Sequence, residues 1–498
     1  MQKPIKKIVI VGGGSAGWMS AAMLARIFST SKEIQVVESE AIGTVGVGEA
    51  TIPPIQQFNA ILGIDEHTFL KRTKGTYKLA IQFEGWGQPN ESYMHTFGDI
   101  GRSLNSVDFH HYWLLAKAHG DSSSYWDYSI NYQAASQHRY DKLDYLPQAK
   151  LPGLVRAYHF DASLYANMLR EYAETRQVKR TEGKIVAVKQ DPDSGSIENI
   201  TLESGLIIEG DLFIDCSGFR GLLISGALQT EYDSYIRWLP CDRAIAIPSE
   251  AERSPIPYTR SIAHDAGWQW QIPLQHRVGN GIVYCSEFWD DNKALAVLEA
   301  NLPSKALREP NFVRFETGRR EKQWNKNVVA IGLASGFLEP LESTSLHLIQ
   351  SGIMRLIKLF PTSTDFRALR DEYNRQSKSE FEQIRDFLIL HYHLNQRGES
   401  AFWTKCREME IPDSLAHKIA LFSQSGRVVR TEDELFSEIA WYQVMMGQNC
   451  VPSAFHPLAH ALPDDKRNVF LDSLKSIATG TVAKMPRHEE YLNRYCVD

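Results

Sequence analysis

The sequence predicts an α/β fold, and three observations support that prediction. An apolar run, a glycine-rich turn and a helix-forming stretch follow one another over residues 8–28, which is the order of a βα unit. A second apolar run ends at the acidic Glu38. From about residue 365 to residue 394, apolar side chains recur at helical spacing. We therefore expect a parallel sheet in the N-terminal part of the chain and a mainly helical C-terminal lobe.

Charge and composition exclude several classes of protein. The 498 residues carry 54 Lys and Arg against 60 Asp and Glu, a net charge of −6, without blocks of basic residues. A nucleic-acid partner therefore has no electrostatic support, and a small-molecule substrate is expected. No run of eighteen apolar residues is present, so we expect no membrane span and a cytoplasmic location. The six cysteines form no CxxC pair, which argues against a disulfide framework and against a metal site.

The glycine-rich turn fits the GxGxxG motif of dinucleotide-binding proteins. In that motif the glycines permit a tight turn, the approach of a pyrophosphate to the backbone, and close packing of the helix. Phosphate would lie at the helix N-terminus. The expected contacts come from the turn and the first helical residues, namely Gly12, Gly14, Ser15, Ala16 and Gly17. Glu38 can accept hydrogen bonds from ribose hydroxyls, which disfavours a 2′-phosphate.

The same turn also fits the nucleophile elbow of hydrolases. Residues 13–17 (GGSAG) match GxSxG in a strand–turn–helix setting, with Ser15 as the nucleophile. However, this strand lies before the sheet that such an elbow follows, and Glu38 completes a dinucleotide unit. We therefore prefer the nucleotide interpretation, with an ordinary acid at a strand end as the alternative role of Glu38.

Two later segments resemble the remaining pieces of a flavoprotein monooxygenase scaffold. Residues 211–218 (DLFIDCSG) and 327–334 (NVVAIGLA) are both apolar strands that run into a glycine turn. At Gly332 and Leu333 the backbone could approach a ribityl chain. This resemblance implies a Rossmann-like, discontinuous FAD-binding domain over residues 1–360, with substrate-side insertions. The helical lobe, residues 361–498, would then cap the substrate site.

Two tryptophans stand one residue apart in residues 267–273 (GWQWQIP). In a strand, Trp268, Trp270 and Ile272 would project to one face and form an apolar ridge that ends at Pro273. Such a ridge suits a wall beside a flavin. Because aromatic stripes usually pack in a core, an ordinary core strand stays open as the alternative.

Four segments resemble the flavin-dependent halogenases, specifically the tryptophan-halogenase branch, and the resemblance covers most of residues 5–360. These segments are residues 46–54 (GVGEATIPP), 76–81 (TYKLAI), 267–273 and 338–344 (LEPLEST). The resemblance implies an enzyme that uses reduced FAD (FADH2), O2 and chloride or bromide to make hypohalous acid, and that halogenates an electron-rich aromatic. It makes the 267–273 segment a wall between flavin and substrate. It also places four residues near the flavin, namely Gly48, Glu49, Ala50 and Thr51.

The resemblance assigns catalytic roles to Lys78 and Glu342. The family's matching lysine receives hypohalous acid, by a hydrogen bond or as a haloamine, and delivers electrophilic halogen to an aromatic carbon; the small Ala80 beside it would leave room. The alternation of apolar residues around Lys78 is equally compatible with a lysine exposed to solvent, and this alternative stays open. Glu342 matches the family's substrate-side acid, and Ser343 its neighbour. A carboxylate stabilised at a helix start stays the alternative for Glu342.

An amphipathic helix is expected to follow Glu342 and to end before Pro361. Its first amides can attract an anion, and the family's halide lies at the pair that matches Thr344 and Ser345. The family's usual glycine is Ser345 here, so we expect altered local dihedrals and an altered halide fit.

The substrate pocket is assigned from two further segments. His95 and Phe97 match the family's His-x-Phe segment, which sandwiches the substrate ring, although a structural histidine stays open. Tyr442 lies where tryptophan-specific enzymes carry tyrosines and a glutamate that hold the amino-acid backbone, although a core role stays open. No glutamate occurs between residues 441 and 455, so an ammonium group would lack its counter-charge. We expect an indole-type substrate rather than free tryptophan.

The chain shows no second dinucleotide motif for NAD(P)H, which implies a separate NAD(P)H-dependent flavin reductase as partner. A homodimer is kept as one possible oligomeric state of the protein. Two other functions stay open as well: an aromatic hydroxylase on the same scaffold, which halide dependence would separate, and a catalytically silent flavin-binding protein, which product formation would separate.

Overall fold

The computed structural model describes residues 4–41, 48–147, 149–251, 254–363, 366–398, 400–431 and 433–497. The chain divides into two compact units, each assembled from three separate stretches of sequence. The first unit contains Met1–Gly75, Phe160–Asp242 and Val313–Glu382, and the second contains Thr76–His159, Arg243–Phe312 and Gln383–Asp498. Among the described residues, no helix combines the length and apolarity that a bilayer crossing requires.

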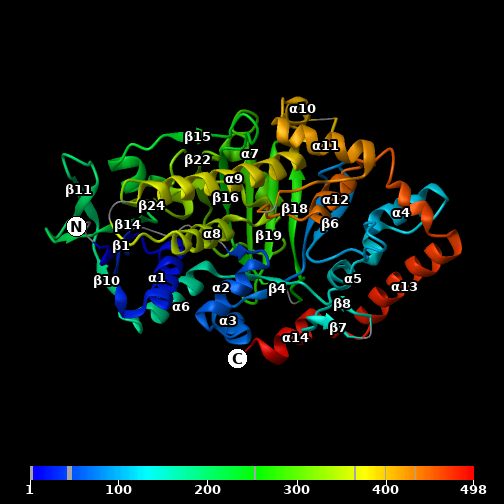
Figure 1. The fold of residues 1–498 in the computed structure, drawn as a ribbon, viewed down its shortest axis with the longest axis horizontal. Coiled ribbons are helices and arrows are strands. Elements are labelled where there is room, and N and C mark those ends of the chain that lie inside the picture. The colour runs from blue at the N-terminus through cyan, green and yellow to red at the C-terminus, as the bar shows by residue number, and fades with distance from the viewer. Residues whose placement is uncertain are drawn as a thin grey trace. The chain divides into compact units, whose positions relative to one another are not determined.

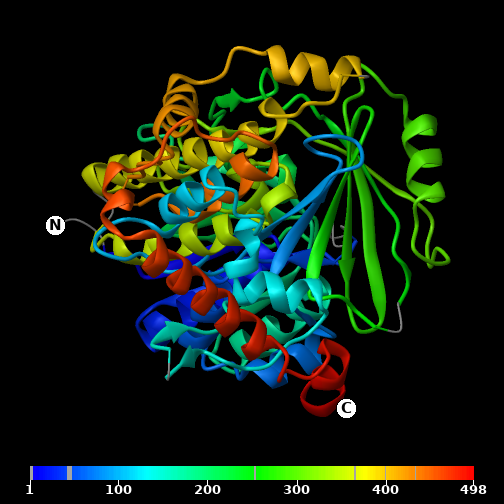
Figure 2. The ribbon, with the colours of Figure 1, turned by 90° about the vertical axis from the view of Figure 1, so that its right-hand side faces the viewer.

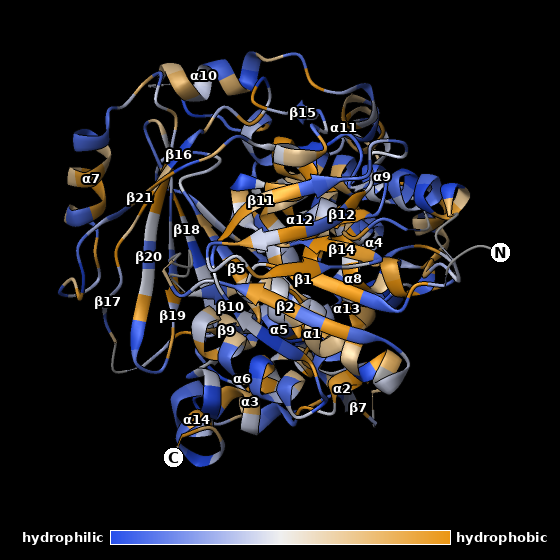
Figure 3. Ribbon diagram, turned by 90° about the vertical axis from the view of Figure 1, so that its left-hand side faces the viewer, coloured by the Kyte–Doolittle hydropathy of each residue, from blue (hydrophilic) through white to orange (hydrophobic). Residues whose placement is uncertain are grey.

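The first unit is built on a six-stranded sheet in the order β10-β2-β1-β14-β24-β23. Its central strands β1 (Lys7–Val11) and β14 (Leu212–Asp215) pair in parallel and are almost entirely apolar, as the hydrophobic colours of Figure 3 show. Such runs are typical of parallel strands that are covered on both faces. The helices α1 (Ser15–Phe28) and α6 (Ala162–Glu174) pack against each other in this unit (Figure 1).

Several smaller elements complete the first unit. A three-stranded antiparallel sheet, β11-β12-β13, adds Ile197, Ile200 and Leu202 to a core shared with Val9 and Phe213. The remaining bounds in the first unit are β2 (Glu33–Glu38), β3 (Glu49–Ala50), α2 (Pro54–Leu62), α3 (Glu66–Thr73), β10 (Lys179–Glu182), β11 (Ile185–Gln190), β12 (Ile197–Leu202), β13 (Ile207–Glu209), β15 (Tyr232–Ser234), β22 (Gly318–Arg320), β23 (Trp324–Asn325), β24 (Val328–Ala330), β25 (Gly336–Phe337) and α8 (Ser345–Lys358).

The second unit contains a larger sheet, in the order β21-β16-β20-β19-β18-β5-β6. Its long strands β18 (Tyr258–His264), β19 (Gly267–Pro273) and β20 (Arg277–Tyr284) form an antiparallel meander. Helix α7 (Asp291–Ala300) lies along this sheet, as Figure 2 shows, and buries Ala294 and Leu298 against it.

Helices make up most of the rest of the second unit. Helix α9 (Arg367–His393) runs from one unit into the other. The remaining bounds are β4 (Thr76–Lys78), β5 (Ala80–Glu84), β6 (Ser92–Thr96), α4 (Phe109–Ala118), α5 (Ile130–Ser136), β7 (Tyr145–Leu146), β8 (Leu151–Pro152), β9 (Ala157–Phe160), β16 (Arg243–Ala246), β17 (Ser249–Glu250), β21 (Asn311–Arg314), α10 (Ala401–Glu408), α11 (Asp413–Ser425), α12 (Glu438–Gly447), α13 (Asp464–Val482) and α14 (His488–Tyr495).

The predicted fold class is confirmed: an α/β protein with a parallel dinucleotide-type sheet and a mainly helical C-terminal part. The predicted helix after the glycine-rich turn is present and begins at Ser15. The boundary between a domain of residues 1–360 and a lobe of residues 361–498 stays a prediction. The compact units group the chain differently, because the segment up to Glu382 belongs with the first unit.

Candidate active site

The glycine-rich turn has the geometry that its glycines predict. Gly12 has a φ of 112°, and a Cβ there would lie 2.3 Å from the carbonyl oxygen of Cys216. A Cβ at Gly17 would lie 1.9 Å from the carbonyl oxygen of Gly12. The turn is therefore too tight for any side chain at either position. Helix α1 begins at Ser15, so its first amides point out of the turn without partners within the helix.

The second predicted glycine loop meets this turn. Gly332 has a φ of 72°, and a Cβ there would come within 2.8 Å of the Cβ of Ala16. Leu333 follows in the short helix Gly332–Ala334, just beyond strand β24. The structure thus brings together the two loops, which are more than three hundred residues apart in sequence, at the carboxyl edge of the parallel sheet, where nucleotides bind in such folds.

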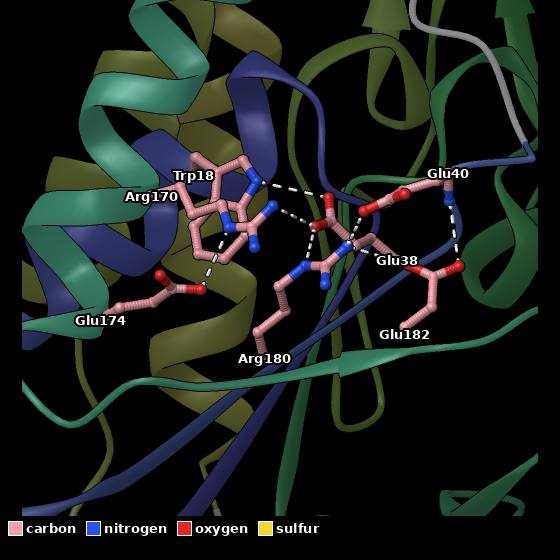
Figure 4. Close-up of polar contacts among 7 residues, drawn as sticks. All are labelled: Trp18, Glu38, Glu40, Arg170, Glu174, Arg180 and Glu182. Atoms are coloured by element: carbon pink, nitrogen blue, oxygen red, sulfur yellow. Dashed lines mark hydrogen bonds and ion pairs between the residues drawn. The ribbon is translucent and has the colours of Figure 1, made fainter.

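Glu38, at the end of β2, lies in a cluster of charged side chains (Figure 4). Its carboxylate accepts hydrogen bonds from Arg180 Nε at 2.5 Å and from Trp18 Nε1 at 3.3 Å. Arg170 lies 4.0 Å away. Sequence reasoning found Glu38 but missed both arginines, which come from elements about 140 residues further along the chain. Their contacts hold Glu38 in place and leave part of its acceptor capacity for another ligand, because an ionised carboxylate can accept about four hydrogen bonds.

The 46–54 segment is described only from Gly48 onward; Gly46 and Val47 lie outside the described residues. Gly48 has a φ of 111° and leads into β3. Ala50 and Thr51 are buried. Burial and, second, the charge of Asp161 raise the pKa of Glu49 to about 7, so this carboxyl group titrates near neutral pH.

The Glu342 segment forms a short helix, Pro340–Glu342, followed by α8. Glu342 is buried, and Ser343 adopts a left-handed conformation with a φ of 59°. Thr344 is the N-cap of α8, and its Oγ1 atom is buried without a hydrogen-bond partner among the described residues. Ser345 is the first residue of α8 and does not have a positive φ. The expected effect of this serine on the local dihedrals and on the halide fit stays a prediction.

Lys78 is completely buried at the end of β4, so the alternative of a solvated lysine is wrong. The alternating segment is split at Leu79 into β4 and β5, which belong to different sheets. The Nζ atom of Lys78 lies 5.4 Å from the ring centroid of Phe97. This distance places the two predicted side chains, one catalytic and one from the substrate pocket, next to each other within the second unit.

The tryptophan segment is a buried strand, β19, as expected. The ring centroids of Trp268 and Trp270 are 6.1 Å apart. Trp270 covers Gly281 of the neighbouring strand, where a Cβ would lie 2.0 Å from the indole. Ile272 and Trp270 share one sheet face by alternation, and Pro273 closes the strand. A cavity of about 350 Å³ lies on the opposite face, where Gln82, Arg260 and Gln271 line it.

His95 lies on β6 and packs edge-on against Phe387 at 5.7 Å. Between His95 and Phe97, the backbone amide and hydroxyl of Thr96 donate to Gln443 Oε1 at 2.9 and 3.0 Å. Gln443 Nε2 donates back to the Thr96 carbonyl oxygen at 3.1 Å. Sequence reasoning missed Gln443, because nothing in its own helix indicates a contact 347 residues away.

Tyr442 lies in the core of the second unit rather than at an open surface. It packs on the ring of His110 at 4.0 Å and on Phe422 at 5.8 Å, and burial raises its pKa. The ligand atoms of Asp108, His110 and His111 lie within 4.8 Å of one another. His110 Nε2 bonds to the Gly426 carbonyl oxygen, and His111 Nδ1 accepts from the His456 amide. Both imidazoles thus serve the packing of this core.

The fold and these sites define a dinucleotide-binding α/β enzyme, and similarity to known proteins identifies its family. The family model described as tryptophan halogenase matches residues 7–464. The chain belongs to this family and is a flavin-dependent halogenase, an oxidoreductase.

Three relatives illustrate the similarity. The structure of Xcc4156, a flavin-dependent halogenase from Xanthomonas campestris, is 47% identical, with a TM-score of 0.96 and 99% of each chain covered. The structure of BrvH, a flavin-dependent halogenase from Brevundimonas sp. BAL3, is 42% identical, with a TM-score of 0.95 and 99% of each chain covered. The tryptophan 6-halogenase ThaL from Streptomyces albogriseolus is 36% identical over 442 residues, which are 85% of this chain and 82% of ThaL.

Proposed function

We propose that this protein halogenates an electron-rich, indole-type aromatic by electrophilic substitution, and that Lys78 delivers the halogen. The observation that carries this proposal is the burial of Lys78 beside the ring of Phe97. Burying a charged lysine side chain costs free energy, so lysines are rarely fully buried unless they are paired with other groups. The position of Lys78 therefore points to a role in the site. An amine held next to an aromatic ring in a closed site suits the transfer of an electrophile to a second aromatic ring.

The residues of the first unit fit FAD. The tight turn at Gly12 and Gly17, the open amides at the start of α1, and the partly occupied carboxylate of Glu38 suit a pyrophosphate and a ribose. Gly332 and Leu333 would contact the flavin part, and the loop from Gly48 to Thr51 would lie beside it. When bound in reduced form, FAD supplies the electrons with which O2 and a halide give hypohalous acid.

The start of α8 fits a halide ion. Helix starts present amides without helical acceptors and the positive end of the helix dipole. The buried hydroxyl of Thr344, which has no partner among the described residues, would donate to the ion. Ser345, the first residue of α8, would contribute its amide. The proposed ion is chloride or bromide.

The chain's own residues then carry the chemistry. Lys78 holds hypohalous acid by a hydrogen bond or as a haloamine, and the halogen forms a bond to the aromatic carbon while its bond to oxygen or to the lysine nitrogen breaks. The oxygen leaves as water. Glu342, with Ser343 beside it, accepts the proton that leaves the ring. Trp268 and Trp270, with Ile272 and Pro273, keep the substrate away from the flavin, which blocks direct oxygen insertion.

Contacts in the second unit favour an indole without an amino-acid backbone. His95 and Phe97 would stack on the substrate ring. Tyr442 is packed into the core, and the nearby Glu434 already pairs with Lys418 at 2.5 Å and accepts from the indole of Trp441 at 3.0 Å. Neither side chain is available to hold the ammonium or carboxylate of free tryptophan, the substrate in the name of ThaL.

Two further features belong to the same proposal. Reduced FAD would come from a separate NAD(P)H-dependent flavin reductase, because the chain carries one dinucleotide motif. The enzyme would work in the cytoplasm, where NAD(P)H is available.

Mass spectrometry of the products tests the proposal. The purified protein is incubated with FAD, a flavin reductase, NADH and O2, with either indole or tryptophan, in chloride, in bromide and without halide. We expect a halogen isotope pattern on indole, none on tryptophan, and loss of product in Lys78→Ala with FAD content unchanged. Halogenation that persists in Lys78→Ala refutes the role of Lys78. An oxygenated product without halogen would indicate a hydroxylase.

A further inference from the structure

A network of hydrogen bonds around the buried His159 links four strands of the second unit, β4, β9, β18 and β19. His159 Nδ1 lies 3.0 Å from Thr76 Oγ1, and His159 Nε2 lies 2.9 Å from Thr259 Oγ1. Thr76 Oγ1 donates to the carbonyl oxygen of Pro273 at 2.7 Å. His159, Thr76 and Thr259 are all buried.

The donor in each hydrogen bond of Thr76 follows from the number of protons that its hydroxyl carries. A threonine hydroxyl has one proton, and that of Thr76 is used on Pro273, so Thr76 must accept from His159 Nδ1–H. Burial, and second the positive charge of Lys78, lower the pKa of His159 well below its ordinary value, so the imidazole is neutral. With its single proton on Nδ1, His159 accepts at Nε2 from the Thr259 hydroxyl.

The strands that this network joins are those that matter for halogen transfer. Thr76 is two residues before Lys78 on β4, and in the pairing of β4 with β9 Thr76 lies opposite His159 and Lys78 opposite Ala157. Pro273 is the last residue of the tryptophan strand β19, and Thr259 lies on β18. The backbone that carries Lys78 is thus bonded to the end of the tryptophan strand.

We propose that His159, Thr76 and Thr259 are positioning residues for Lys78, which fix its strand relative to the tryptophan strand. This inference rests on the proposed role of Lys78 in halogen transfer. A lysine side chain has four rotatable bonds, so accurate delivery requires a fixed backbone beneath it. A displacement of about 1 Å costs on the order of 100-fold in rate.

The test compares four variants in the complete enzyme with FAD, flavin reductase, NADH, O2, bromide and indole. Thr76→Val removes the hydroxyl with little change in shape, and Thr76→Ser restores it. His159→Asn retains a donor near the Nδ1 position but loses the bond to Thr259. Thr317→Val is the matched control, because Thr317 is also fully buried and donates to a carbonyl oxygen, that of Leu239, at 3.1 Å, outside the network.

Four quantities are measured: bromoindole formed per NADH, hypobromous acid that escapes to a diketone trap, the KM for bromide, and the FAD content of the purified protein. For Thr76→Val we expect bromoindole per NADH to fall roughly 10- to 100-fold, more acid to escape, and FAD content and KM for bromide to stay unchanged. Thr76→Ser should recover most of the product. His159→Asn should lie between Thr76→Val and the wild type.

Two results overturn the inference. In the first, the ratio of bromoindole to trapped hypobromous acid is the same in Thr76→Val and in Thr317→Val. The network then does not position Lys78. If Thr76→Val loses product but Thr76→Ser does not recover it, the hydroxyl is not responsible. Failure of the proposed function is recognised separately: a wild type that forms no bromoindole, or a Lys78→Ala variant that still does, removes the role of Lys78 and this inference with it.

Discussion

Replacing Glu380 should loosen the helix that is proposed to hold the halide. Glu380, on α9, accepts hydrogen bonds from Ser351 at 2.9 Å and Arg355 at 2.6 Å, and its other oxygen lies 3.2 Å from His347 Nε2. The three partners are four residues apart and form one stripe along α8. One partly buried carboxylate therefore holds two full turns of this helix.

The pKa of Glu380 gives the size of the effect. Burial raises the pKa, but the hydrogen bond from His347 and the charge of Arg355 outweigh it and lower the pKa from its ordinary value of 4.5 to about 2. Each tenfold change in proton affinity is worth about 1.4 kcal/mol, so the ionised group contributes about 3 kcal/mol of folding stability. Removing one partner of a fully buried ion pair costs ~3–5 kcal/mol, so about 3 kcal/mol is in keeping with this partly buried pair.

The assay is the free energy of unfolding of Glu380→Gln, from urea titration, together with hydrogen exchange of the α8 amides. Because the folded-state pKa is lowered, the stabilisation is present above pH 4.5 and is lost as the pH falls toward 2. We therefore expect a loss of about 3 kcal/mol at pH 7 that shrinks below pH 4.5. The control is Glu382→Gln, on the same helix, whose ion pair with Lys378 is partly exposed at 3.8 Å and should matter little.

The reasoning fails if Glu380→Gln is within about 0.5 kcal/mol of the wild type at pH 7, since surface substitutions commonly change stability by that amount. It also fails if the loss stays constant down to pH 3. A raised KM for halide at pH 7 in Glu380→Gln would extend the effect to the proposed halide site.

Two other substitutions give distinct expectations. Gly17→Ala places a Cβ 1.9 Å from the carbonyl oxygen of Gly12, so the purified protein should lose most of its FAD absorbance and melt at a lower temperature; normal FAD content would contradict the proposed dinucleotide turn. Thr344→Val removes a buried hydroxyl that has no partner among the described residues, so the melting temperature should stay the same or rise. Its KM for halide should increase several-fold, and an unchanged KM would exclude this hydroxyl as a halide ligand.

The sequence was most informative where the chemistry is local. The turn at Gly12 and the strand that ends at Glu38 follow from residues that are close together in the chain, because tight turns and alternating strands are determined by nearby sterics. The helix that follows Glu342 was predicted for the same reason. These elements could therefore be predicted from short stretches of sequence.

The sequence could not reveal partners that only tertiary structure brings together. Arg180 reaches Glu38 from a parallel strand 142 residues later, and Gln443 reaches Thr96 from a helix 347 residues later. The burial of Lys78 was also hidden, because alternation with apolar neighbours is equally compatible with a lysine in solvent. Long-range packing decided these cases, and no local pattern encodes it.

The order of the strands in the first unit also constrains how the protein is made. Strand β1 pairs with the nearby β2, but on its other side the parallel sheet is completed only by β14 at residue 212 and, beyond it, β24 at residue 328. Contacts of such large sequence separation slow folding, because long loops must close before any contact stabilises the chain. During synthesis the N-terminal β1–α1–β2 segment must therefore wait for some three hundred residues to emerge before its sheet is complete. In a cell that overproduces this enzyme, slower translation or more chaperone should therefore raise the yield of folded protein more than a stronger promoter does.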